Sequence, residues 1–221
     1  MRRMNRSRGT WIALTLTVGL TTSGCAALPK ASVLFHHTPL LHKGTIPLKA
    51  CLTPFQDARP PEEQKALRNI QALSDQVTAV VLRDFTDARL FESLQFNDAT
   101  NADVILRGEI RSFTWRSNFN PLPFIPYAQI VSFFGVPAGK NVGKVAFALE
   151  VVDARTNQVI ATYAKSSGEE RDYSIYQASD YRAAGGEETG NAFRVTVDQL
   201  QAALLQDRER LVSAVRPGGA S

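Results

Sequence analysis

Apolar and polar residues alternate over 46–55, where Leu48, Ala50 and Leu52 recur at every second position. A period of two places them on one face of a β-strand. The same kind of alternation predicts strands over 102–115, 142–153 and 159–165. Because turn-forming residues at 153–158 join the last two, we expect these strands to form a β-hairpin.

Apolar residues at steps of three and four predict two amphipathic helices, over 61–88 and 190–215. Pro61 and the acidic pair Glu62 and Glu63 suit the first turn of the earlier helix. The stripes are Leu67, Ile70, Leu73, Val77, Val81 and Phe85 in that helix, and Phe193, Val197, Leu200, Leu204, Leu211 and Val215 in the later one. The polar stretch 166–188 predicts a loop with a short helical turn near 176–181.

The predicted order is therefore β-α-β-β-β-α. Strands combined with two long one-faced helices favour an α+β fold, in which both helices pack on one face of a mixed sheet. We expect one α/β domain over 45–216 and a disordered tail over 217–221. A chain of this length buries about two-thirds of its unfolded surface, which is enough for one core.

An uncharged insertion, residues 117–139, separates the second and third predicted strands. Its four prolines exclude an uninterrupted transmembrane helix. Long connections that are apolar rather than polar are usually functional. Its candidate contact residues are Leu122, Phe124, Ile125, Tyr127, Ile130, Phe133 and Phe134.

Three interpretations of this insertion remain open. It covers the core, it docks on a partner or a second copy of the chain, or it lies in a membrane interface where aromatic side chains sit at headgroup level. We favour docking.

The N-terminus has the pattern of a secretory signal. Four arginines, Arg2, Arg3, Arg6 and Arg8, precede the apolar run 11–20, which is too short to remain as a membrane span. The following Ser23-Gly24-Cys25 resembles the lipobox of bacterial lipoproteins. The resemblance implies cleavage of residues 1–24 and a lipid on Cys25, and residues 25–44 then predict a flexible tether. The alternative is a plain secretory signal with an incidental cysteine.

Removal of that signal changes the charge of the chain. The whole sequence has 25 Lys and Arg against 21 Asp and Glu, and the four signal arginines account for the entire excess. The mature chain is therefore neutral, which argues against a nucleic-acid partner. If Cys25 carries lipid, Cys51 has no cysteine to pair with, and its apolar strand predicts a buried, inert thiol.

The sequence shows no constellation of catalytic or metal-binding residues. All three histidines, His36, His37 and His42, lie in the tether without acidic or thiol neighbours, so we expect no metal site and no cofactor. Two pairs of carboxylates, Asp84 with Asp87 and Glu169 with Glu170, are interpreted as solvated charges. We expect that the protein is not an enzyme.

Asp57 and Arg59 follow the first predicted strand, at an end where sheets often present functional groups. We expect a local salt bridge that stabilises the turn, with a partner contact as the alternative.

Several short phrases together resemble a group of periplasmic lipoproteins. They are Leu52-Thr-Pro-Phe-Gln-Asp-Ala-Arg59, Leu90-Phe91, Ala102-Asp-Val-Ile-Leu-Arg-Gly-Glu109 and Val151-Val-Asp-Ala-Arg-Thr-Asn-Gln-Val-Ile160. They are similar to the curli-secretion lipoprotein and to the N-terminal domain of the Tol-system propeller protein. The resemblance implies a noncatalytic envelope domain that assembles with itself or with other envelope proteins. Curli-secretion relatives form pores with extra β-hairpins, but residues 117–139 lack the alternation that a barrel strand needs.

The favoured hypothesis is a membrane-anchored lipoprotein that serves as a structural or assembly subunit of a cell-envelope complex. Ala26 follows the lipidated cysteine, and the absence of Asp there favours the periplasmic face of the outer membrane. The alternative is a lipid- or ligand-binding accessory of an envelope transport system, with residues 117–139 forming part of a pocket.

Replacing Phe133 and Phe134 with Ser tests the docking interpretation. We expect normal folding, measured by circular dichroism, and a smaller assembly, measured by native mass spectrometry. The reason is that the substitution removes two apolar contacts. Loss of soluble protein would indicate instead that the segment covers the core. Normal folding with an unchanged assembly state would contradict docking.

Overall fold

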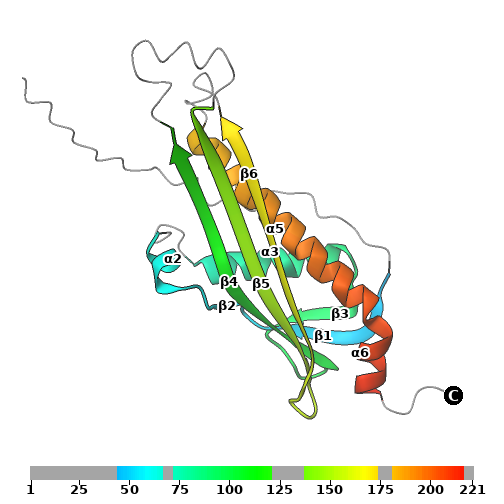
Figure 1. The fold of residues 1–221 in the computed structure, drawn as a ribbon. Helices are drawn as coiled ribbons and strands as arrows, with labels where there is room; N and C mark the ends of the chain where they lie inside the picture. The colour runs from blue at the N-terminus through cyan, green and yellow to red at the C-terminus, as the bar shows by residue number, and fades with distance from the viewer. Residues whose placement is uncertain (1–43, 67–71, 121–136, 174–180, 217–221) are drawn as a thin grey trace, which may run out of the picture.

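The computed structural model describes residues 44–66, 72–120, 137–173 and 181–216 (Figure 1). The predicted signal, Cys25, the tether and all seven candidate contact residues of the insertion lie outside these ranges. Within them, no helix has the length and apolar character that a membrane span requires.

A mixed sheet forms one layer of the domain. Its strands are β1 (Ile46–Leu52), β2 (Gln56–Asp57), β3 (Phe91–Phe96), β4 (Val104–Phe119), β5 (Gly139–Asp153) and β6 (Val159–Tyr173). The order is β3-β1-β4-β5-β6, with β2 beside β4. β1 is parallel to both of its neighbours, whereas β4, β5 and β6 are antiparallel. The predicted hairpin is the pair β5 and β6.

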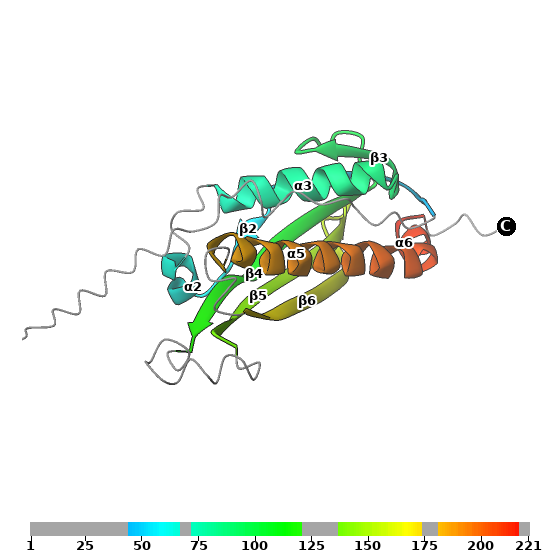
Figure 2. The same ribbon diagram turned by 90° about the horizontal axis from the view of Figure 1, so that it is seen from above.

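Helices form the second layer. They are α2 (Pro61–Ala66), α3 (Leu73–Asp87), α5 (Tyr181–Gln206) and α6 (Arg208–Val215). The long helices α3 and α5 lie on the same side of the sheet (Figure 2). α3 contacts β3, and α5 crosses β4, β5 and β6. The predicted α+β class, with two long helices on one face of a mixed sheet, is confirmed.

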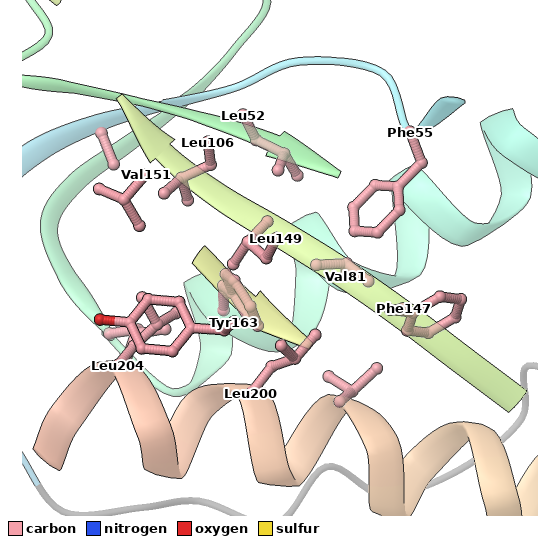
Figure 3. Packing of buried hydrophobic residues seen from close by; sticks show 14 of the residues in the cluster. Leu52, Phe55, Val81, Leu106, Phe147, Leu149, Val151, Tyr163, Leu200 and Leu204 are labelled. Carbon is pink, nitrogen blue, oxygen red and sulfur yellow. The ribbon is translucent and has the colours of Figure 1, made fainter. Parts of the chain in front are cut away.

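The core fills the space between these two layers. Side chains of Leu106, Leu149 and Val151 point from the sheet toward Leu200 and Leu204 of α5 (Figure 3). Phe147 is at the centre, because its ring makes edge contacts with Phe55 and Phe193 at centroid distances of 5.6 Å each. The described members of both predicted helical stripes are buried.

A β-bulge at Arg111 sets which residues of β4 face the core. Ile110 pairs with Phe147 and Ser112 with Ala146, so Arg111 has no partner on β5. The extra residue shifts the alternation by one, and both Ile110 and Phe113 are fully buried. A strict period of two over the predicted strand 102–115 would place Ser112 on the face of Leu106 and Ile110, and the bulge places Phe113 there instead.

The helices begin and end differently from the prediction. The single helix expected over 61–88 is two helices, and Ala72, just before α3, has φ 53° in the left-handed region that a continuous helix does not contain. The last helix begins earlier than expected, at Tyr181. It ends at Gln206, and Asp207 (φ −91°, ψ 5°) separates it from α6.

Three strand segments were not predicted from the sequence: the two-residue strand β2, the strand β3 and the end of β6. β3 was not predicted, because its alternating residues at 91–96 are mostly polar or half exposed on an edge strand. β6 continues to Tyr173, through part of the predicted loop 166–188. It too is an edge strand, and its polar stretch is held by pairing with β5 rather than by burial.

Phe147→Ala tests the aromatic centre of the core. We expect the free energy of unfolding to fall by about 3–5 kcal/mol, because the substitution removes buried surface and leaves a cavity. Urea denaturation measures this loss. The control is Phe96→Ala, since Phe96 is 50% exposed, and its effect should be about 0.5 kcal/mol or less. Equal losses in the two variants would contradict the assignment of the core.

Candidate functional site

The apolar insertion is rooted at the tip of the β4–β5 hairpin. Phe119 pairs with Gly139, so the chain leaves and re-enters the sheet at one place. The backbone N–H of Asn120 donates to the carbonyl of Ala138 at 2.7 Å, and its side-chain amide donates to the carbonyl of Pro137 at 3.1 Å. These bonds close the ladder immediately before the insertion.

Tyr173 at the end of β6 fixes the same root from the other side. The N–H of Ala138 donates to the carbonyl of Tyr173 at 2.8 Å, and Ala138 is fully buried. Gly139 lies so close to the Tyr173 ring that an added Cβ would stand 2.2 Å from the phenolic oxygen. Only glycine fits there, and the two ends of the insertion are therefore held by three strands.

This root lies at the opposite end of the domain from the first described residue. A Cβ on Gly44 would meet Leu205, near the C-terminal end of α5. Gly143, close to the root on β5, packs against Glu188 and Thr189 in the N-terminal half of α5. Glu188 and Leu205 are about 17 residues apart, so about 25 Å of helix separates the two places. Figure 1 shows the β4–β5 tip and β1 at different ends of α5.

Cys51 is a buried free thiol, as the sequence predicted. Desolvation raises its pKa, which lowers the thiolate fraction and therefore the reactivity. The lipidation of Cys25 and the contacts of the seven insertion residues remain predictions.

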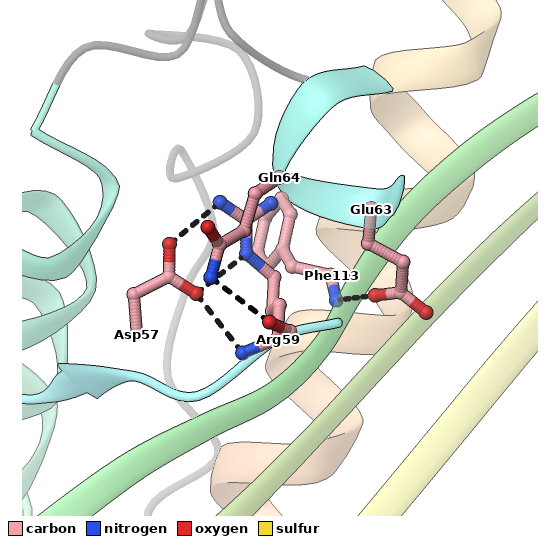
Figure 4. Close-up of polar contacts among 5 residues, drawn as sticks. All are labelled: Asp57, Arg59, Glu63, Gln64 and Phe113. Atoms are coloured by element: carbon pink, nitrogen blue, oxygen red, sulfur yellow. Dashed lines mark hydrogen bonds and ion pairs between the residues drawn. The ribbon is translucent and has the colours of Figure 1, made fainter. Parts of the chain in front are cut away.

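The predicted local salt bridge between Asp57 and Arg59 is confirmed (Figure 4). Arg59 Nε donates to Asp57 Oδ1 and Nη2 donates to Oδ2, both at 2.8 Å. The Arg59 side chain is only 4% exposed. Hydrogen bonds from Arg59 hold the pKa of the Asp57 carboxyl below its ordinary value, so this pair is a buried cation with one local carboxylate.

Glu63 links α2 to the bulge in β4. Its carboxylate accepts from Ser112 Oγ at 3.2 Å and from the backbone N–H of Phe113 at 3.3 Å. The bulge disrupts the ladder locally, so a side-chain acceptor here satisfies a backbone donor. The sequence suggested only a favourable dipole interaction for Glu63, because the bulge itself was not predicted.

A second group of polar residues, Trp115, Asn141 and Glu188, was not predicted from the sequence. Trp115 pairs with Gly143 on the face that carries α5, and Asn141 lies two residues away on the same face. Asn141 and Glu188 are each 1% exposed. Burial is the largest influence on the pKa of Glu188 and raises it. Its own backbone N–H and nearby Arg171 lower the pKa, and Glu187 and Glu169 raise it. The sequence placed Glu188 in the predicted loop 166–188, so its burial was not predicted.

The paired carboxylates are not grouped for catalysis in the described structure. Asp84, expected to be solvated, is 1% exposed and pairs with Arg83 at 2.9 Å, so that expectation is wrong. Asp87 is exposed. Glu170 pairs with Lys140 at 2.9 Å, and Glu169 accepts from Asn191 at 3.3 Å. Among the described residues, no three His, Cys, Asp or Glu side chains are grouped to hold a metal ion.

No protein-family model matches this chain, and no curated protein matches it in sequence. In structure it is similar to protein XCC0632 from Xanthomonas campestris, described as DUF330, with a TM-score of 0.54 and 11% identity over 80% of this chain and 94% of that one. This similarity shows a shared fold.

Two further solved structures are less similar. Lipoprotein B from Nitrosomonas europaea has a TM-score of 0.41 and 12% identity over 81% of this chain and 96% of that one. The PelC dodecamer from Paraburkholderia phytofirmans has a TM-score of 0.40 and 9% identity over 75% of this chain and 94% of that one.

Asp57→Asn tests the salt bridge. At neutral pH we expect a loss of about 1–3 kcal/mol in the free energy of unfolding, because a buried cation loses its charged partner. Because the pKa of Asp57 is lowered in the folded protein, the stabilisation that its charge provides is complete above an ordinary carboxyl pKa of about 3.9. This stabilisation is lost as the pH falls below that value toward the lowered pKa. The difference from wild type in urea melts should therefore shrink in acid.

The matched control for this prediction is Asp87→Asn, which removes an exposed carboxylate from the end of α3. We expect its effect to stay within about 0.5 kcal/mol. A loss for Asp57→Asn that persists unchanged in acid would show that the carboxylate charge is not the cause.

Proposed function

We propose that this protein is a noncatalytic, lipid-anchored assembly subunit of a bacterial cell-envelope complex, and that the apolar insertion rooted on β4 and β5 is its contact with another protein. One observation carries the proposal. The insertion extends from a rigid three-stranded root at the end of α5 far from Gly44, where the anchoring segment joins the domain.

The position of the root favours a protein partner over the anchoring membrane. Residues 25–43 connect Cys25 to Gly44, and a flexible chain of about 19 residues has a root-mean-square length of about 24 Å. The root lies about 25 Å further along α5, on the opposite end of the domain. A segment that leaves the sheet at this root starts from the end of α5 far from Gly44, which favours contact with another envelope protein or a second copy over the anchoring membrane.

The remaining parts of the proposal come from the sequence. The acylated Cys25 supplies the membrane attachment. The apolar insertion is then not needed to attach the domain to the membrane, which leaves it for a contact with another protein. Ala26 after the cysteine favours the periplasmic face of the outer membrane. The carboxylates considered as catalytic pairs are occupied by local partners, since Asp84 pairs with Arg83, Glu170 with Lys140 and Glu169 with Asn191. Their arrangement therefore gives no support to a catalytic role.

Site-specific photo-cross-linking in the native envelope tests the proposal. A photoreactive phenylalanine analogue is introduced at position 133 in the full-length protein, and cross-linked products are identified by mass spectrometry. We expect a protein adduct from position 133. The control is the same analogue at Phe96, an aromatic residue on β3 that is 50% exposed, and it should give no such adduct.

Three results would contradict the proposal. The first is an adduct from position 133 to lipid only. The second is an adduct only within the same chain, which would indicate that the insertion covers the core. The third is an equal yield of protein adducts from positions 133 and 96, which would show that any exposed aromatic residue gives the signal.

A further inference from the structure

The helix α5 packs on the sheet in two chemically different ways. Its C-terminal half buries Phe193, Val197, Leu200 and Leu204 against the aromatic and aliphatic core. Its N-terminal half instead lies on Gly143, where an added Cβ would stand 2.5 Å from the backbone N of Thr189. The close approach leaves no room for a side chain at position 143.

The N-terminal contact contains buried polar atoms that lack hydrogen-bond partners in the described structure. They are Asn141 Oδ1 and Nδ2, both carboxyl oxygens of Glu188 and Trp115 Nε1. The C-terminal half of α5 contributes two such atoms, Arg194 Nε and Gln201 Oε1. A buried polar atom without a partner destabilises the packing that buries it. The contact around Glu188 holds more of these atoms than the C-terminal half of α5, although Glu187, Thr189 and Asn191 bond to Arg171, Thr114 and Glu169 of the sheet.

Among the described side chains, no cation is committed to Glu188. Arg171 of β6 is engaged by Glu187 at 3.0 Å. Glu169, also on β6, and Glu187 add negative charge nearby. From β4 and β5 the adjoining side chains are Trp115 and Asn141, which are uncharged. Burial without a committed cation favours the neutral carboxylic acid while the interface is closed.

We propose that residues 187–191 of α5 form a pH-sensitive switch, which separates from β4 and β5 when Glu188 loses its proton to solvent. Opening exposes the carboxylate of Glu188 to water. It exposes the amide of Asn141 and the indole N–H of Trp115 at the same time. The C-terminal half of α5 remains packed through Phe193 and Leu200, so the hinge lies near Ala192.

The direction of the pH effect follows from the raised pKa. The closed form binds the proton more tightly than the open form does. Closing is therefore most favourable in acid and weakens as the pH rises from the ordinary carboxyl value, about 4.3, toward the raised value of the closed form. Because Gly143 and Asn141 adjoin Gly139 on β5, opening changes the surface beside the root of the insertion.

Hydrogen exchange of the full domain, read by mass spectrometry at pH 5 and pH 8, tests the switch independently of any partner. After correction for intrinsic exchange rates, we expect protection of the 187–191 amides to fall at least several-fold at pH 8, while residues 193–204 stay protected. In Glu188→Gln the fall should disappear, because the side chain keeps its size and cannot ionise. The control Glu209→Gln removes an acid that is 90% exposed on α6, and it should behave as wild type.

Each other result overturns the proposal. Protection of 187–191 that is low at both pH values and unchanged in Glu188→Gln would indicate ordinary fraying of the helix. Protection equal to that of 193–204 at both pH values would show a closed, static interface. Failure of Glu188→Gln to fold would also contradict it, since removing the ionisable group should stabilise the closed form at pH 8.

Discussion

The packing of α5 across β4, β5 and β6 is the constraint on which the rest of the domain depends. These three strands alone would be a meander with one apolar face and no cover. Phe147 and Phe193 meet edge to face at the centre of the contact, with a centroid distance of 5.6 Å. The burial of that face holds the long strands against α5, and the β4–β5 tip lies at the end of α5 away from the domain's first strand (Figure 1).

The bulge in β4 adapts the sheet to this packing. A regular alternation would turn Phe113 away from α5, and the extra residue Arg111 brings it back into the core. The local break in the ladder is compensated by Glu63 of α2, which accepts from the backbone N–H of Phe113. The short helix α2 therefore supports the packing of β4.

The same arrangement separates the two features that bear on function. The chain enters the domain near the C-terminal end of α5 and presents the root of the apolar insertion at the other end. The polar contact around Glu188 lies beside that root rather than beside Gly44. The separation of the root from Gly44 is the arrangement on which the proposed role, a link between a membrane and another protein, depends.

The amino-acid sequence by itself determined the α+β class, the apolar stripes of both long helices, the buried Cys51 and the Asp57–Arg59 bridge. These depend on local periodicity and on neighbours a few residues apart, which a sequence displays directly. Only the tertiary structure decided that 61–88 is interrupted at Ala72, that β3 and the end of β6 are edge strands, and that Glu188 is buried. The reason is physical: edge pairing, a bulge and the burial of a charge are all set by residues distant in sequence, and no local pattern records them.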